Sequence, residues 1–266
     1  MANVDVRRLK LWQDQIETDV EIGGSGPPLL WLHGPWGLNQ DRPFIERLAE
    51  GHTVHAPRFP GTTKGDPNSV HSLGDWHDLV VYYGELMDRL GLAAPVVAGH
   101  SFGALLAAEF AAAAPKSVSR LVLIDPVGLW RDDKPVKNWM VIAEKARRSA
   151  LFADPEGEAA KRFFAVPGDP EGRVDTLAQI VWSQACTGKF VWPIADRGFD
   201  RRAHRIAAPT LIVWGKADNI IAVDYAQEFA QRIAGARVAL IDKAGHLPHL
   251  EQPEVAMKAV RAFLDS

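Results

Sequence analysis

An apolar run from Val96 to Ala98 leads into the pentapeptide Gly-His-Ser-Phe-Gly at residues 99–103, and a helix-forming run follows at residues 104–110. This order predicts a strand, a tight turn and a helix. A serine at the centre of such a turn exposes its hydroxyl above the sheet, and only small flanking residues let the backbone close. We therefore expect Ser101 to be a nucleophile, although the pentapeptide alone is also compatible with an ordinary loop before a helix.

Seven other segments are predicted to be strands. Residues 8–13 and 16–22 alternate polar and apolar side chains, which is typical of a hairpin at a sheet edge. Continuous apolar runs, better suited to strands buried on both faces, occupy residues 29–32, 53–56, 119–125, 210–214 and 237–241. Helices are expected at residues 44–50, 72–90 with Ser72 as N-cap, 224–233 and 254–264. This alternation predicts an α/β fold with a doubly wound, mostly parallel eight-stranded sheet flanked by helices.

One long segment breaks the alternation of strand and helix. It has no run of strand character, and helical patterns rich in aromatic and basic residues cover residues 136–149, 155–164 and 174–187. We interpret it as a helical cap inserted into the sheet domain. The core domain would then comprise residues 1–127 and 207–266, and the cap residues 128–206.

Two polar residues follow predicted strands in the last part of the chain. Asp218 lies just past one strand, and His246 lies just past the next. A serine hydroxyl needs a base to take its proton and a carboxylate to hold that base in the right tautomer. The order Ser, Asp, His is the one expected for this architecture. Asp125, which also follows a strand, is a weaker candidate for the acid. Taken alone, Asp218 could cap a helix and His246 could be a loop residue.

Nearly the whole chain resembles the α/β-hydrolase fold superfamily. The similar segments are residues 99–103 for its nucleophile elbow, 33–37 for its oxyanion loop, 57–61 for the loop after its fourth strand, 214–218 for its acid-bearing turn and 245–253 for its histidine loop. The resemblance implies Ser101 as nucleophile, His246 as general base and then acid, and Asp218 as the residue that orients His246. Haloalkane dehalogenases and epoxide hydrolases of this fold use an aspartate nucleophile, so the serine argues against those chemistries.

The expected oxyanion loop departs from the family pattern at one residue. Similar enzymes use the amide of the residue after the His-Gly pair, and here that residue is Pro35, which has no N–H group. We expect the amides of Phe102 and Trp36 to form the oxyanion hole instead. A plain turn between a strand and a helix is the alternative reading of residues 33–37.

These assignments predict acyl transfer to water through an acyl-enzyme, with a small to medium apolar ester or lactone as substrate. Side chains expected to bind it are Trp139, Phe163, Trp182 and Leu247. Aromatic residues at helical spacing can equally be the core of the cap itself. Two alternatives stay open: a carbon–carbon bond hydrolase of a ring-cleavage diketone that uses the same triad, and a non-catalytic ligand receptor on this fold.

Composition excludes several other classes of protein. The formal net charge of −3, with both signs interspersed, gives no reason to expect a nucleic acid partner. We expect no metal and no cofactor, because no Cys/His spacing suggests a metal site, and we interpret the single Cys186 as a small core residue. His33, His100 and His249 are expected to be structural. The sequence has no signal-like or membrane-spanning run, so we expect a cytoplasmic monomer or homodimer.

Overall fold

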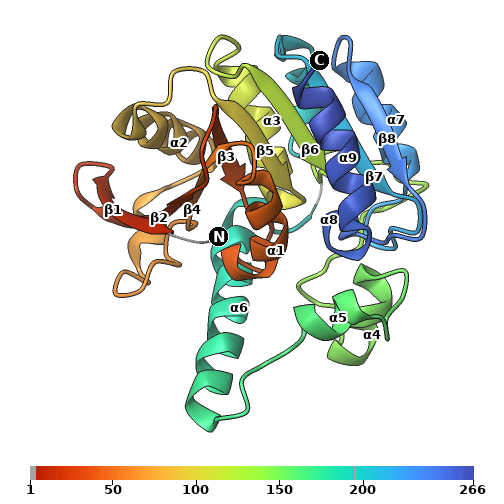
Figure 1. The fold of residues 1–266 in the computed structure, drawn as a ribbon, viewed down its shortest axis with the longest axis horizontal. Coiled ribbons are helices and arrows are strands. Elements are labelled where there is room, and N and C mark those ends of the chain that lie inside the picture. The colour runs from red at the N-terminus through yellow and green to blue at the C-terminus, as the bar shows by residue number, and fades with distance from the viewer. Residues whose placement is uncertain (1–3, 195) are drawn as a thin grey trace.

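The computed structural model describes residues 4–194 and 196–266, which fold around one eight-stranded sheet (Figure 1). The strands are β1 (Asp5–Leu11), β2 (Ile16–Gly23), β3 (Pro28–Leu32), β4 (Thr53–Pro57), β5 (Val96–His100), β6 (Arg120–Ile124), β7 (Thr210–Gly215) and β8 (Arg237–Ile241). Their order across the sheet is β1-β2-β4-β3-β5-β6-β7-β8. β2 pairs antiparallel with β1 and β4, and the other pairs are parallel. The predicted fold class is confirmed.

The burial of each strand follows its place in the sheet. β5 and β7 are buried along their whole length, and β3 and β6 are buried except at their first residue, as continuous apolar runs require. The edge strands β1 and β8 are mostly exposed. β5 lies among the central strands, so the residue that follows it emerges at the middle of the sheet's carboxyl edge.

Helices cover both faces of the sheet (Figure 1). One layer contains α1 (Leu38–Leu48), α8 (Pro248–Glu251) and α9 (Pro253–Leu264), which contact one another. α2 (Trp76–Leu90) and α3 (Phe102–Ala113) contact each other, and α7 (Asp224–Arg232) and α3 both contact the short helix Ala203–Arg205. α3, which begins directly after Ser101, is buried on nearly every side. The turn at Ser101 therefore joins a fully buried strand to a helix that is buried on nearly every side.

Two predicted helix starts are wrong. The helix expected from Ser72 begins at Trp76, because the carboxylate of Asp75 accepts the N–H of Asp78 at 3.0 Å and caps it. Residues 69–72 form a separate 3₁₀ turn. The helix expected over residues 44–50 begins earlier, at Leu38, and continues through Pro43.

The segment between β6 and β7, interpreted as a cap, contains the 3₁₀ helices Phe199–Arg201 and Ala203–Arg205 and, before them, three α-helices among the described residues. The α-helices are α4 (Glu144–Leu151), α5 (Glu158–Phe163) and α6 (Pro170–Val191), and α6 projects away from the sheet (Figure 1). Residues 136–143, expected to be helical, form an irregular segment with a turn at residues 139–140 instead. Val136 and Trp139 are buried there, and the amide of Lys137 donates to the carbonyl of Ile220 at 3.0 Å. These contacts with the core hold the segment in a non-helical conformation despite its helical sequence pattern. The boundaries of the cap stay a prediction.

Candidate active site

Ser101 occupies a strained turn between β5 and α3. Its φ of 54° and ψ of −112° lie in a region that side chains rarely adopt, and its amide donates to the carbonyl of Ile124 at 2.9 Å. A Cβ atom at Gly103 would overlap the backbone carbonyl of Leu32. The second glycine of the pentapeptide is therefore required by the close approach of α3 to β3.

The structure brings Ser101, His246 and Asp218 into one hydrogen-bonded chain. The Oγ atom of Ser101 lies 2.9 Å from Nε2 of His246, and Nδ1 of His246 lies 2.8 Å from Oδ2 of Asp218. The side chains of His246 and Asp218 are fully buried. The other carboxylate oxygen of Asp218 accepts the amides of Ile220 at 2.7 Å and Ile221 at 3.0 Å, which fixes its orientation. This geometry allows His246 to receive the proton of Ser101.

Asp125 lies behind this chain as a second buried carboxyl group. Its Oδ1 atom accepts the amide of Gly215 at 3.0 Å, while Oδ2 is buried without a partner in the described structure. Burial, reinforced by the nearby charge of Asp218, raises the pKa of Asp125 well above its ordinary value. Nδ1 of His246 bonds to Asp218, so the geometry agrees with Asp218, rather than Asp125, as the acid.

The oxyanion loop is closed by a turn in which the amide of Gly37 donates to the carbonyl of Gly34 at 3.2 Å. Trp36 is buried in it, and its ring lies 5.9 Å from that of His246 at an angle of 74°. Phe102 opens α3, where the first amides of a helix have no partner within the helix. Phe102 and Trp36 thus lie beside triad residues, and the role of their amides in an oxyanion hole stays a prediction.

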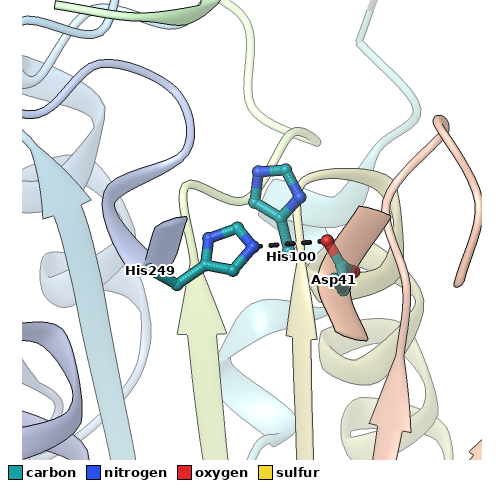
Figure 2. A group of neighbouring side chains, drawn as sticks. All are labelled: Asp41, His100 and His249. Atoms are coloured by element: carbon teal, nitrogen blue, oxygen red, sulfur yellow. Dashed lines mark hydrogen bonds and ion pairs between the residues drawn. The ribbon is translucent and has the colours of Figure 1, made fainter. Parts of the chain in front are cut away.

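A second buried cluster contains Asp41, His100 and His249 (Figure 2). Nε2 of His249 lies 3.3 Å from Oδ1 of Asp41, and the ring of His100 lies 4.5 Å from that of His249. Nε2 of His100 bonds to the backbone carbonyl of His246 at 2.8 Å. Burial, followed by the two neighbouring histidines, lowers the pKa of His100 well below its ordinary value. Sequence reasoning missed Asp41, which carries no local signal for this contact.

These two clusters are also where a metal ion could be held. In each, three possible ligand atoms lie within 4.8 Å of one another: Asp41, His100 and His249 in one, and Asp125, Asp218 and His246 in the other. Both ring nitrogens of His246 are already engaged, by Ser101 and Asp218. The second group therefore has a use that needs no metal.

A model of the alpha/beta hydrolase family matches residues 29–259. The chain belongs to this family. It is 26% identical over 251 residues to Lipase 3 of Moraxella sp. (strain TA144), an alignment that covers 91% of this chain and 78% of that protein. It is 28% identical over 244 residues to the pimeloyl acyl-carrier-protein methyl ester esterase of Aromatoleum aromaticum, with 86% of this chain and 94% of that protein covered. The resemblance inferred from the motifs is confirmed.

Solved structures of other α/β-hydrolases share the fold. An esterase from Exiguobacterium antarcticum superposes with a TM-score of 0.75 at 22% identity, covering 97% of this chain and 99% of that one. A meta-cleavage product hydrolase from Pseudomonas fluorescens superposes with a TM-score of 0.75 at 19% identity, covering 97% of each chain. Since both enzymes match equally well, the fold does not choose between ester and carbon–carbon bond cleavage.

The residues expected to bind substrate in this hydrolase fall into two groups. Trp139 and Phe163 are buried, and their rings lie 6.5 and 5.9 Å from that of Trp36. Leu247, beside His246, is also buried. Trp182 is different because it is 39% exposed on α6 and donates its indole N–H to the carbonyl of Gly61 at 2.8 Å. Their role in binding stays a prediction.

The histidine loop and α6 are tied to different parts of the molecule. The carboxylate of Glu251 accepts the amides of Ala153 at 2.9 Å and Asp154 at 3.1 Å, and also that of Gly245 beside His246. On the other side, the ammonium of Lys189 on α6 donates to the carbonyls of Val70 and Leu73 at 3.0 and 2.6 Å.

Two expectations about the rest of the hydrolase can be compared with the structure. Cys186 is buried as predicted, and burial raises the pKa of its thiol to about 12. Among the described helices, none combines the length and apolar character that crossing a bilayer requires.

Proposed function

We propose that this α/β-hydrolase is a serine esterase that cleaves a small to medium apolar ester or lactone through an acyl-enzyme. The observation that carries the proposal is the continuous hydrogen-bonded chain from Ser101 through His246 to Asp218. The relatives named lipase and methyl ester esterase, each aligned over most of this chain, support ester cleavage rather than another reaction of the fold.

The reaction would proceed in two half-reactions. Oγ of Ser101 attacks the ester carbonyl carbon while Nε2 of His246 takes its proton, and the carbonyl oxygen becomes an oxyanion next to the amides of Phe102 and Trp36. The carbon–oxygen bond to the alcohol then breaks, and the alcohol leaves with the proton of His246. Water, deprotonated by His246, attacks the acyl-enzyme, and the acid and free Ser101 are released. Asp218 stabilises the protonated His246 in both half-reactions.

The proposal is tested by reaction of the purified protein with a fluorophosphonate probe and by turnover of 4-nitrophenyl esters of increasing acyl length. We expect covalent labelling and ester turnover in the wild type, and neither in Ser101→Ala. A folded wild-type protein that is not labelled and turns over no ester would refute the proposal. Turnover of ring-cleavage diketones at a higher kcat/KM than any ester would instead favour the carbon–carbon bond hydrolase.

A further inference from the structure

One cleft is lined by residues of α4, α5 and α6 and by Trp36. Its volume is about 260 Å³, close to the lower end of ligand pockets in proteins. Its apolar walls are formed by Phe163, Phe164, Leu177, Ile180 and Val181. Such walls can hold an alkyl chain, because the chain buries apolar surface there at the expense of contact with water.

Trp36 connects this cleft to the triad. The Trp36 side chain lines the cleft, and its ring also lies 5.9 Å from the ring of His246. Phe163, another wall residue, packs edge-on against Trp36 at 5.9 Å. Trp36 thus borders both the cleft and His246.

The charged residues that line the cleft all have one sign. They are Arg147, Arg148 and Arg173, and no acidic side chain is among the described lining residues. The chain as a whole has a formal net charge of −3, so a cleft whose described lining residues include three arginines and no acidic residue is not typical of its surface.

A second groove in the same molecule is lined by charges of both signs. It runs beside β2 and α6, and its basic residues Arg58 and Lys64 are accompanied by Asp19, Glu21 and Asp175. There Arg58 is paired with Glu21 at 3.1 Å. The arginines of the first cleft have no such acidic neighbours among the lining residues, so that cleft can accept an anion from outside.

Two of these arginines are in positions that favour binding of an anion. The guanidinium of Arg148 lies over the ring of Phe164, 4.6 Å from its centre, which holds the side chain at the apolar wall. Nε of Arg147 is buried without a hydrogen-bond partner in the described structure. A guanidinium beside an apolar wall binds a carboxylate or phosphate more strongly than one in open water, because the local dielectric constant is lower.

We propose that the substrate is an ester that carries an anionic group at the far end of an apolar chain. The chain would lie along the walls of the cleft, and the anion would bind to Arg147, Arg148 and Arg173. The inference rests on the proposed esterase activity and narrows its substrate class. The anionic group can belong to the acyl or the alcohol side of the ester, and the experiment separates the two.

The test compares four esters in matched pairs. On the acyl side, monomethyl suberate is compared with methyl octanoate, and on the alcohol side the acetate ester of 8-hydroxyoctanoate with octyl acetate. We expect kcat/KM for the charged member of one pair to exceed that of its neutral partner by about tenfold or more, as one charge-assisted hydrogen bond allows. Arg148→Gln/Arg173→Gln should reduce this ratio to near one, whereas Lys258→Gln, which removes a positive charge outside the cleft, should leave the ratio unchanged. The rate of fluorophosphonate labelling checks that the double variant still assembles its triad.

Equal kcat/KM within both pairs, or a ratio that survives in the double variant, would overturn the inference. Binding to Ser101→Ala protein separates this failure from failure of the esterase proposal. Octanoate should quench tryptophan fluorescence at concentrations about tenfold lower than octanamide, and the two arginine substitutions should remove the difference. If octanoate binds in this way but no ester is turned over, the cleft is as proposed and the esterase assignment is wrong. If octanoate binds no better than octanamide, the proposed class of ligand is wrong.

Discussion

The protein contains two buried histidine–carboxylate pairs on neighbouring elements, and only one of them faces a nucleophile. In the first pair, His246 bonds to Asp218 through one ring nitrogen and contacts the hydroxyl of Ser101 through the other. In the second pair, His249 bonds to Asp41 and its ring packs against the ring of His100 (Figure 2). Both sets are buried and use the same residue types.

The two pairs differ in what holds the carboxylate and in what the histidine reaches. The His246–Asp218 bond is 2.8 Å long, and two backbone amides orient that carboxylate. The His249–Asp41 bond is 3.3 Å long, and Nδ1 of His249 has no partner in the described structure. Residue type and burial alone therefore do not identify an active site. The hydroxyl on a strained turn at a helix start makes the difference.

The largest expected difference between the pairs concerns catalysis. Ser101→Ala should lower kcat by roughly 10⁶-fold, because no other group can form the acyl-enzyme. His249→Gln should lower kcat by less than about tenfold, since His249 lies outside the hydrogen-bonded chain of the triad. Steady-state kinetics with a 4-nitrophenyl ester measures both. A His249→Gln variant as inactive as Ser101→Ala, yet folded, would mean that the second pair takes part in the chemistry.

Substitution of the two aspartates should likewise affect catalysis in the first pair and stability in the second. Asp218→Asn should lower kcat by roughly 10⁴-fold at neutral pH, because the amide favours the wrong tautomer of His246. Asp41→Asn should instead lower the free energy of unfolding by about 1–3 kcal/mol, because Asp41 accepts the indole N–H of Trp31 at 3.1 Å inside the core. Urea unfolding and kinetics on both variants give the two readouts. Comparable losses of kcat would remove the distinction between the pairs.

A glycine lies beside each pair, and the stability lost when it is replaced by alanine should report how rigid the surroundings of that pair are. Gly103→Ala places a Cβ against the carbonyl of Leu32, which cannot move aside, and should cost about 3 kcal/mol or more of stability. Gly34→Ala places a Cβ 2.6 Å from Nδ1 of His100, a ring that can shift, and should cost less. Thermal unfolding compares them, with Gly51→Ala, which has open space, as control. Equal losses for the first two would contradict the expected order.

The pH dependence of stability should have opposite signs in the two clusters. Asp125 keeps its proton in the folded state at pH values where the unfolded carboxyl has lost it, so stability falls as pH rises above about 4. Asp125→Asn removes this effect, so its unfolding temperature relative to wild type should increase from pH 5 to pH 8. Exposed Asp14→Asn is measured in parallel as the control. A constant difference between Asp125→Asn and wild type would contradict the raised pKa.

His100 should produce the smaller, reverse trend. It stays neutral in the folded state, while the unfolded imidazole takes a proton below about pH 6.5, so stability falls as pH decreases through that range. His100→Gln, which can keep the hydrogen bond to the carbonyl of His246, should be relatively more stable than wild type at pH 5 than at pH 8. Thermal unfolding at both pH values is the measurement. An opposite trend would mean that His100 is charged in the folded protein.

Much of the fold could be predicted because its signals are local. The eight strands are continuous apolar or alternating runs, and the triad residues each follow a strand in the expected order. The Asp41–His249 contact could not be predicted, because it joins residues 208 positions apart and neither residue belongs to a periodic pattern. The start of α4 could not be predicted from the local sequence pattern either, because Val136 and Trp139 pack into the core and keep their segment from forming a helix. The position of three arginines around one apolar cleft could likewise not be predicted, because it depends on how α4 and α6 pack in the folded protein.

The helical insertion is anchored to the core on both sides of the cleft. Glu251 fastens the segment after α4 to the loop of His246, while Lys189 fastens α6 to the loop before α2. The α4 side and the α6 side of the cleft are therefore anchored to different loops of the core, and the indole of Trp182 adds a further bond from α6 to the carbonyl of Gly61. Displacement of α6 alone would leave the bonds from Glu251 to the segment after α4 and to the loop of His246 unbroken.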